Sequence, residues 1–216
     1  MNVKWLGHAC FLISSDDGTK IVTDPYHPGG GLGYRAPDET ADVVTVSHEH
    51  NDHNNVGAVK GKPQILRGIG THRAKGIDFR GVPTSHDQAS GAQRGPNVVY
   101  CFEVDGIRVC HLGDLGHELS AKTIAEIGPV DVLMIPVGGT FTIDAKEANR
   151  VANSLAARIV IPMHYQNERC RSFPVATVDA FRKLWVSVRD VNGAEIEVRK
   201  EDLPTAAETV ILKPCR

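Results

Sequence analysis

The chain has 216 residues, which is enough for one domain with a sizeable core or at most two small ones. Hydrophobic residues make up 41% and charged residues 23% of the sequence, as is usual in soluble globular proteins. The formal net charge of −2 gives no indication of a polyanionic partner such as a nucleic acid. No apolar run approaches the roughly 20 residues that a membrane-spanning helix needs, so no membrane partner is expected.

The cysteines and the first ten residues indicate the compartment. No two cysteines form a C-x-x-C pair, and their number is odd: Cys10, Cys101, Cys110, Cys170 and Cys215. This pattern predicts neither a disulfide framework nor a cysteine zinc site, and it favours a reducing cytoplasm. The N-terminus lacks a basic stretch followed by a long apolar one, so no signal peptide is expected. The sequence therefore predicts a cytoplasmic protein.

Short strand-like runs separated by turn residues fill the first half of the chain. Asp16-Asp17-Gly18 and Asp105-Gly106 are typical hairpin turns. The run 41–47 is mostly apolar, as expected of a strand buried on both faces. Strands are predicted over Val3–Leu6, Cys10–Ile13, Lys20–Thr23, Ala41–Ser47, Val98–Val104 and Ile107–Leu112.

In the second half, helices alternate with strands. Helices are predicted over Glu118–Ile127, Asp144–Ala157 and Val175–Val188. Strands are predicted over Val130–Val137, Arg158–Ile161, Glu195–Val198 and Thr209–Leu212. In the last helix we expect Phe181, Leu184 and Trp185 to face inward. This order predicts mixed sheets covered by helices in a single domain that spans residues 1–216.

Between two of the predicted strands lies a glycine-rich segment, Pro25–Pro37, which we expect to form no regular element. It carries Tyr26, His27, Tyr34 and Arg35. Two interpretations stay open at this point. The segment is either an ordinary surface loop or a flap that gates the access of substrate to a neighbouring site.

Directly after the strand at 41–47 comes a segment rich in metal-ligand side chains. His48, His50, Asp52 and His53 follow one another in H-x-H-x-D-H order. Imidazole and carboxylate together suit zinc, and also iron or manganese. In an extended segment His48 and His50 point to the same side, whereas Asp52 and His53 reach a neighbouring position. The segment therefore predicts two metal ions side by side, and the alternative is a polar loop that binds none.

With this motif the chain resembles the metallo-β-lactamase superfamily. Other motifs follow the order of that family along the whole chain: Leu6-Gly7-His8-Ala9, Thr23-Asp24-Pro25, Thr84-Ser85-His86, Leu112-Gly113-Asp114 and Ile161-Pro162-Met163-His164-Tyr165. Their order and the compact length resemble the branch of stand-alone hydrolases that includes ascorbate-6-phosphate lactonase-like proteins. The resemblance implies an α+β fold, a four-layer αββα sandwich, with the site at one edge of the two sheets.

The resemblance also implies a ligand set for two divalent ions, expected to be zinc, with manganese or iron as alternatives. The ligands divide into His48, His50 and His86 for one ion, Asp52, His53 and His164 for the other, and Asp114 as the bridge. A shared carboxylate is physically apt there, because two divalent ions about 3.5–4 Å apart repel each other.

Three of these ligands have competing interpretations. His111 lies just before Asp114, but its apolar neighbours place it within a strand, so His86 is preferred. Asp114 follows a strand and would alternatively be a turn-forming or capping aspartate. His164 follows an apolar strand and would alternatively be a core histidine.

Weaker candidates surround the predicted centre. His8 is a candidate to line the site or to contact substrate, and His72 is expected on the surface. Further candidates at the rim are His27, His117, Arg35, Arg67 and Arg94. Arginine matches the geometry of carboxylate and phosphate groups, although an ordinary surface charge is the favoured interpretation of each of the three arginines. Tyr165 is a candidate donor to an oxyanion, with simple packing as the alternative.

The predicted reaction is hydrolysis by a hydroxide that bridges the two metals and attacks a carbonyl carbon or a phosphorus. Asp52 and His164 are the predicted catalytic residues, and Asp52 would also receive the proton of the attacking water. The expected substrate is a small-molecule ester, lactone or phosphodiester, because the nucleases of this family carry an inserted domain for which the chain has no space. The resemblance further implies a homo-oligomer.

Two other functions are alternatives to hydrolysis. Diiron oxygen reductases of the same fold carry a glutamate where this chain has His50, and they need an electron donor such as a flavin domain. The main alternative is a non-catalytic metal-binding or regulatory module. A closed structural site is saturated by protein ligands, whereas the predicted ligands leave a position for water, which favours catalysis.

Overall fold

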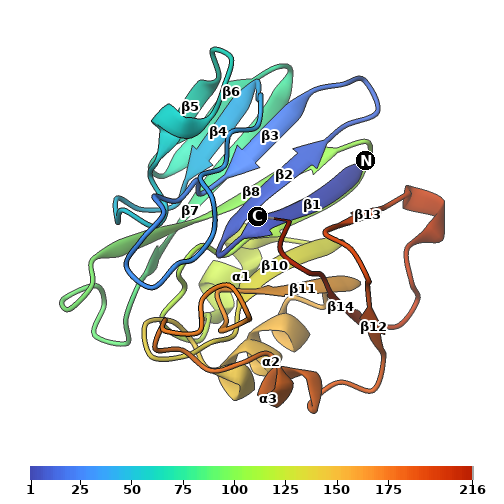
Figure 1. Ribbon diagram of the computed structural model, residues 1–216. Coiled ribbons are helices and arrows are strands. Elements are labelled where there is room, and N and C mark those ends of the chain that lie inside the picture. The colour runs from blue at the N-terminus through green and yellow to red at the C-terminus, as the bar shows by residue number, and fades with distance from the viewer. Residues whose placement is uncertain (216) are drawn as a thin grey trace.

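The computed structural model describes residues 1–215, and their strands form two sheets (Figure 1). The first sheet has the order β13-β1-β2-β3-β4-β5. Its strands are β1 (Asn2–Gly7), β2 (Cys10–Ser14), β3 (Lys20–Thr23), β4 (Val43–Val46), β5 (Gln64–Arg67) and β13 (Glu195–Glu197). The last of these comes from far along the chain and pairs with β1 as an edge strand.

The second sheet has the order β12-β14-β11-β10-β9-β8-β7-β6. Its strands are β6 (Gly70–Ala74), β7 (Ile77–Ser85), β8 (Pro96–Val104), β9 (Ile107–His111), β10 (Val132–Pro136), β11 (Ile159–Met163), β12 (Val188–Asp190) and β14 (Glu208–Ile211). The hairpin turn at Asp105-Gly106 connects β8 and β9 as predicted, with a φ of 52° at Asp105 and 72° at Gly106.

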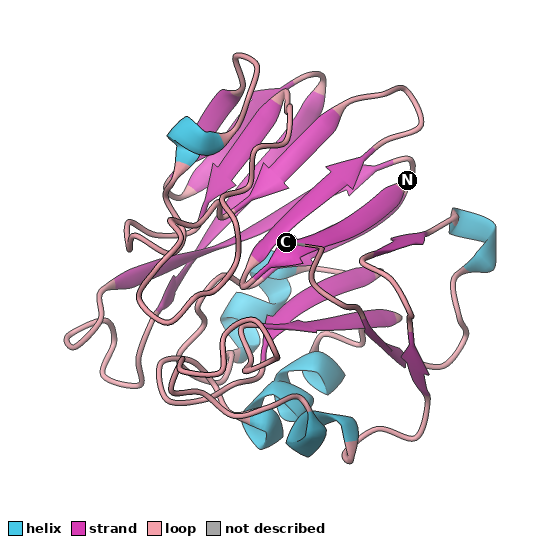
Figure 2. Ribbon diagram, viewed as in Figure 1, coloured by secondary structure: helices cyan, strands magenta, loops and turns pink. Residues whose placement is uncertain are grey.

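The α-helices gather beside the second sheet (Figure 2). They are α1 (Ala121–Ile127), α2 (Ala145–Ser154) and α3 (Asp179–Arg182), and two short 3-10 helices are η1 (Val56–Ala58) and η2 (Lys200–Asp202). The helix α1 begins after Ser120, whose hydroxyl accepts the N–H of Thr123, and it ends at Gly128 with a φ of 74°. Among the helices of residues 1–215, none is long and apolar enough to cross a membrane.

A continuous apolar core lies between the two sheets. Trp5 and Phe11 point into it from the first sheet, and Tyr100 and Met134 do so from the second. All four side chains are fully buried. Complete burial of one such side chain stabilises the fold by about 1.5–3 kcal/mol, so the sandwich is held together mainly by this layer.

The outer face of the first sheet is buried as well, because alternate residues of its strands point away from the core. Leu6 and Leu12 belong to a second apolar cluster together with Tyr26 and Tyr34 of the glycine-rich segment. This segment, predicted to lack regular structure, lies on the sheet as a packed loop. The α+β sandwich is thus confirmed, but loops and η1 form the layer outside the first sheet.

The directions of the strands determine which edge of the sandwich collects their carboxyl ends. In the first sheet β3, β4 and β5 are parallel, and β1 runs with them because β1 and β3 are both antiparallel to β2. In the second sheet β9, β10 and β11 are parallel, and β7 runs with them because β7 and β9 are both antiparallel to β8. The carboxyl ends of β1, β3 and β4 therefore share one edge, as do those of β7, β9 and β11.

The predicted helix Val175–Val188 is wrong over most of its length. Only α3, four residues long, is helical there, and Val188 begins strand β12, which pairs with Thr209 and its neighbours. Of the side chains expected to face inward, Phe181 is buried and Trp185 partly buried, but Leu184 is 41% exposed. The β-branched residues at the end of the segment are recruited to the edge of the sheet, and this pairing overrides the helical period.

The N-terminal cap of α2 offers a test of the fold. Asp144 accepts the N–H groups of Lys146 and Glu147, and the Glu147 side chain accepts the N–H of Asp144, which is a complete capping box. We expect Asp144→Ala to lower the free energy of unfolding by about 1 kcal/mol, measured by urea denaturation. Asp78→Ala removes the same charge from an exposed ion pair with Arg73 and should cost less. Equal losses in the two variants would contradict the capping role.

Candidate metal centre

Three strands of one direction in each sheet present a histidine or an aspartate just beyond their carboxyl ends. They are His8 after β1, Asp24 after β3, the segment 47–53 after β4, His86 after β7, Asp114 after β9 and His164 after β11. Three of these residues have a positive φ: 52° at His8, 39° at Asp24 and 52° at His164. Side chains other than glycine rarely adopt this conformation, so sharp turns aim these residues towards one another.

The carboxylate of Asp114 lies at the centre of this group. Its Oδ2 is 3.1 Å from Nε2 of His86, 3.2 Å from Nε2 of His53 and 3.3 Å from Nε2 of His164. Nε2 of His48 lies 3.9 Å away. Asp114 itself is 2% exposed, and its N–H is bonded to Asn97 Oδ1 at 3.0 Å. One buried carboxylate therefore contacts histidines from both sheets.

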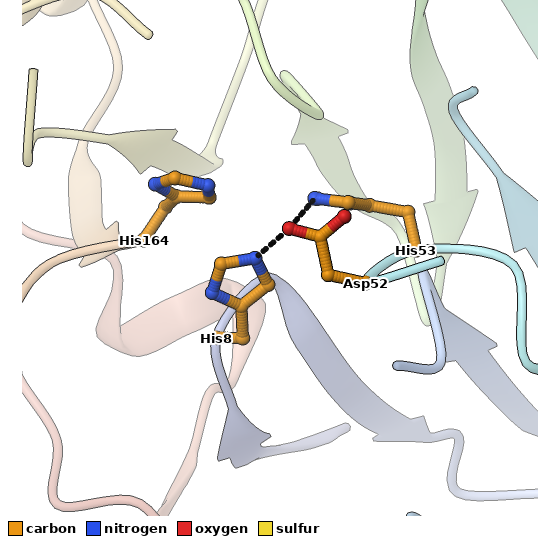
Figure 3. A group of neighbouring side chains, drawn as sticks. All are labelled: His8, Asp52, His53 and His164. Carbon is orange, nitrogen blue, oxygen red and sulfur yellow. Dashed lines mark hydrogen bonds and ion pairs between the residues drawn. The ribbon is translucent and has the colours of Figure 1, made fainter. Parts of the chain in front are cut away.

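Around Asp114 the potential ligands form two main groups, and the ligand atoms of each group lie within 4.8 Å of one another. One group consists of His48, His50 and His86, and the other of His8, Asp52, His53 and His164. Figure 3 shows the second group, with Asp52 between the rings of His8 and His53. The division follows the one that the resemblance implies, and His8 is the addition. That these atoms hold metal ions is a proposal.

His8, a weaker candidate in the sequence, lies within the second ligand group. The residue is 2% exposed, and its Nε2 lies 3.2 Å from Oδ2 of Asp52 (Figure 3). Its ring is 4.2 Å from that of His164, measured between centroids. Burial and the charge of His164 lower the pKa of His8 to about 4, so the ring is neutral at pH 7. A neutral imidazole beside an aspartate suits either metal binding or the fixing of that carboxylate.

Asp24 and Ser47 support the histidines from behind, through hydrogen bonds to the rings of His53 and His48. The sequence motifs assigned no role to either residue. Oδ2 of Asp24 accepts hydrogen bonds from Nδ1 of His53 at 2.9 Å and from the Ser47 hydroxyl at 2.5 Å. The Ser47 hydroxyl in turn lies 2.9 Å from Nδ1 of His48. These bonds fix Nδ1 as the protonated nitrogen of both rings and leave Nε2 of both rings to face Asp114.

Several buried polar atoms at the centre lack a hydrogen-bond partner within the described part of the chain. They are Nε2 of His48, Nε2 of His53, Nδ1 of His86, Nδ1 of His164 and Oδ1 of Asp114. A buried polar atom left unsatisfied costs about 1–3 kcal/mol, so a concentration of them indicates a missing ligand. Ring nitrogens and carboxylate oxygens are the donors that divalent transition metals prefer. The residues present therefore fit the metal ions implied by the motifs.

Two carboxylates of the centre stay ionised, and at least one of its imidazoles is neutral. Burial alone would raise the pKa of Asp114, but the charges of His164 and His53 hold this pKa well below its ordinary range. The pKa of Asp52 is lowered as well, against the effect of burial, chiefly by His53. Burial and the charge of His53 lower the pKa of His48 to about 3. The centre thus offers two anionic carboxylates and a neutral imidazole at pH 7.

The centre opens to solvent on one side, where His50 is exposed and Asp52 is half-buried. A pocket of about 260 Å³ lies there. It is lined by His50, Asp52, His86, Arg94, Asp114, Phe141, His164 and Phe173. A small molecule in this pocket would contact residues of both ligand groups at once.

His111, the competitor of His86, is engaged elsewhere. It is the last residue of β9, as predicted, and it is fully buried. Its Nε2 lies 2.8 Å from the carbonyl oxygen of Ala9, and its Nδ1 accepts the N–H of Gly113 at 3.2 Å. Both ring nitrogens are thus engaged, Nε2 in a bond between the two sheets and Nδ1 in the turn after β9. The structure brings His86 into the cluster in place of His111.

The remaining histidines lie outside the two ligand groups. His27 borders a second cavity beside Asp52, at the tip of the glycine-rich segment. His117 accepts the N–H of Ser85 at 3.1 Å through Nε2, which makes it a brace for the strand end before His86. His72 is half-exposed on β6. Gating of the site by the segment Pro25–Pro37 stays a prediction.

Tyr165 and two of the three candidate arginines lie away from the pocket at the centre. The hydroxyl of Tyr165 donates to the carbonyl of Leu212 at 3.4 Å, and its ring packs 5.2 Å from that of Trp5, so packing accounts for this residue. Arg35 is exposed. Arg67 forms an ion pair with Glu49. Of the three arginine candidates, Arg94 alone lines the pocket at the centre.

Replacement of the two competing histidines distinguishes their roles. We expect His86→Ala to lower the metal content of the purified protein by about one ion per chain, because one group would lose a ligand. His111→Gln should lower the melting temperature, since its bonds to Ala9 and Gly113 are disturbed, but should keep the metal content. Elemental analysis and thermal denaturation measure both. Normal metal content in His86→Ala together with a loss in His111→Gln would reverse the assignment.

The support formed by Asp24 can be tested separately. We expect Asp24→Asn to weaken metal binding by about 10–100-fold, because the His53 ring loses its carboxylate acceptor, and so does the Ser47 hydroxyl that orients the His48 ring. Competition with a chromogenic chelator gives the affinity. Thr23→Ser changes the neighbouring residue, whose hydroxyl is bonded to Ala9 and Phe11 and not to the cluster, and it serves as the control. An unchanged affinity in Asp24→Asn would rule out the supporting role.

Comparison with known proteins places this centre in a family. A family model described as a β-lactamase superfamily domain matches residues 2–164. A UPF0173 metal-dependent hydrolase of Carboxydothermus hydrogenoformans is 29% identical over 92% of this chain and 100% of its own length. A UPF0173 metal-dependent hydrolase of Methanoregula boonei is 32% identical over 76% of this chain and 82% of its own length.

A solved structure from Thermotoga maritima shares both sequence and fold with this chain. It is classed among the Zn-dependent hydrolases of the metallo-β-lactamase superfamily, with 41% identity and a TM-score of 0.81. The match covers 98% of this chain and 97% of that one. Together with the family model, this likeness bears out the resemblance first seen in the motifs. The chain belongs to the β-lactamase superfamily, among its metal-dependent hydrolases.

Proposed function

We propose that this protein holds two divalent metal ions, zinc in the first place, and hydrolyses a small-molecule ester, lactone or phosphodiester. The observation that carries the proposal is the position of Asp114. Its Oδ2 lies 3.1 Å from a histidine of one ligand group and 3.2–3.3 Å from two histidines of the other. A single carboxylate in contact with both groups is the arrangement that a bridging ligand requires.

When bound, two such ions supply Lewis acidity and lower the pKa of water towards neutrality. The chain's own residues then position the reactants. Asp52 lines the pocket, and the His8 ring holds its carboxylate at 3.2 Å. Because the pKa of Asp52 is lowered, this carboxylate is anionic at pH 7 and can accept the proton of the attacking water. His164 lines the same pocket and holds Asp114 from the side of the second sheet.

Zinc is proposed because the donors are imidazoles and carboxylates, with manganese and iron as the alternatives. The substrate is proposed to be small because the pocket measures about 260 Å³, below the usual range of cavities for drug-sized ligands. The net charge of −2 supports no nucleic-acid substrate. Assembly into a homo-oligomer and a cytoplasmic location complete the proposal.

A non-catalytic metal-binding module is the second candidate. A structural site would be closed by protein ligands on all sides. Here His50 is exposed and Asp52 half-buried, and both face a pocket. The open side favours catalysis over a structural role.

The proposal is tested by elemental analysis combined with hydrolysis assays on a chromogenic ester, a lactone and a phosphodiester. We expect about two metal ions per chain and turnover of at least one substrate, abolished by a chelator and restored by zinc. Asp114→Asn should lower the metal content and reduce kcat by at least 100-fold, because the carboxylate that joins the two groups loses its charge.

Glu49→Gln is the matched control. Glu49 lies within the same motif but is exposed and ion-paired with Arg67, so its loss should leave metal content and turnover nearly unchanged. A wild-type protein that binds one ion tightly and turns over none of the three substrates would favour the non-catalytic module. Full activity of Asp114→Asn with two bound ions would exclude Asp114 as the bridge.

A further inference from the structure

We propose that Arg94 is the residue that selects the substrate, and that the substrate is an organic anion: a compact molecule with a carboxylate or phosphate group and an apolar part. The inference rests on the proposed function, because it concerns the pocket beside the same centre. Arg94 lines this pocket together with His50, Asp52 and His86. Among residues 1–215, no other arginine or lysine lines this pocket.

Arg94 lies where three cavities adjoin. Besides the pocket of about 260 Å³ at the centre, it lines one of about 420 Å³ with His48 and His50, and one of about 360 Å³ with Gln88 and Thr142. A group bound to its guanidinium can therefore come from a molecule that extends in any of these directions. In the described part of the chain, Arg94 is the one residue that lines all three cavities, and its side chain is rich in hydrogen-bond donors.

The charge of Arg94 is not neutralised by a carboxylate. Within residues 1–215, no aspartate or glutamate lies within ion-pair distance of its guanidinium, which donates one hydrogen bond to the Thr140 carbonyl at 3.2 Å. Arg67, which lines the neighbouring cavity, is by contrast paired with Glu49. A planar guanidinium with spare donors beside a pocket matches the two oxygens of a carboxylate or phosphate.

The loop that carries Arg94 is held in a fixed shape by hydrogen bonds to one carboxylate. The carboxylate of Asp87, the residue after His86, accepts the N–H groups of Arg94 at 2.7 Å and Gln93 at 3.0 Å. It also accepts those of Ala89 at 2.8 Å and Gly91 at 2.9 Å. Four backbone donors on one side chain tie the whole loop to the strand end that presents His86. The backbone of Arg94 is therefore fixed relative to the centre, and its guanidinium is held by the Thr140 carbonyl and the Phe141 ring.

Two phenylalanines form the apolar wall of the same pocket. The Arg94 guanidinium carbon lies 5.6 Å from the centroid of the Phe141 ring, and the rings of Phe141 and Phe173 are 5.5 Å apart. The first contact holds the cation over an aromatic face. The wall leaves space for an apolar or planar group next to the anion. The pocket thus combines a cation, an apolar wall and the hydrolytic centre within one small volume.

Two matched esters test the inference on the zinc-loaded protein: 4-nitrophenyl hydrogen glutarate, which is anionic, and its neutral methyl ester. In both, the hydroxyl of water adds to the acyl carbon and the bond to the aryl oxygen breaks, releasing 4-nitrophenolate. Wild type should favour the anionic ester in kcat/KM. We expect Arg94→Gln to lower kcat/KM for that ester by about 10–100-fold, mainly through KM, and to change the neutral ester less than about threefold. Arg94→Lys should restore part of the preference.

Arg67→Gln is the control, because it removes a cation that is already paired, and it should change neither ester by more than about threefold. Binding gives a readout that needs no turnover: calorimetry with 3-phenylpropionate, benzylphosphonate and the neutral 3-phenylpropionamide. Loss of the preference for either anion in Arg94→Gln, with normal metal content, supports the inference, and the stronger of the two anions identifies the head group.

An anion preference that survives in Arg94→Gln would overturn the inference, because the anion would then be held by the metal centre. An equal loss for charged and neutral ligands would also overturn it. The proposed function fails in a different way. In that case wild type hydrolyses neither ester, and the calorimetry still reports whether Arg94 recognises an anion.

Discussion

The burial of the Asp114 carboxylate is the constraint on which the rest of the centre depends. A buried anion is costly unless positive charge or hydrogen bonds surround it. Histidines supply these partners from β4 in the first sheet and from β7 and β11 in the second. Because the partners come from both sheets, the sandwich must bring the carboxyl ends of its parallel strands to one edge. The order of the strands and the position of the candidate metal centre therefore both follow from the need to surround the Asp114 carboxylate.

Sequence alone predicted the part of the centre that is local. His48, His50, Asp52 and His53 lie so close in the chain that their density and spacing indicate a metal site before any fold is known. Asp24 could not be assigned a role in this way, because it acts only through His53 and Ser47, more than twenty positions away in the chain. His8 was underrated for the same reason, since its contact with Asp52 joins two separate strand ends.

The fold shows the same division between local and distant effects. The central strands were predicted because they are buried on both faces and read as apolar runs, β10 and β11 most clearly. The edge strands β5 and β6 were missed, since they expose most of their side chains and leave no apolar pattern to detect. The strand β7, which lies between β6 and β8, was missed as well. The prediction of a helix at Val175–Val188 was wrong, because Val188 pairs with β14. This pairing depends on the sheet, and the spacing of apolar residues in the segment does not reveal it.

Chemistry and selectivity come from different parts of this molecule. The rings and carboxylates of the centre sit at the ends of buried strands, so any change in their geometry disturbs the core between the sheets. Arg94, Phe141 and Phe173 sit on loops, which can vary without disturbing that core. The Asp87 carboxylate gives the first of these loops a fixed shape through its own backbone bonds and not through the core. A protein built in this way can keep one hydrolytic centre while its loops determine which molecule reaches it.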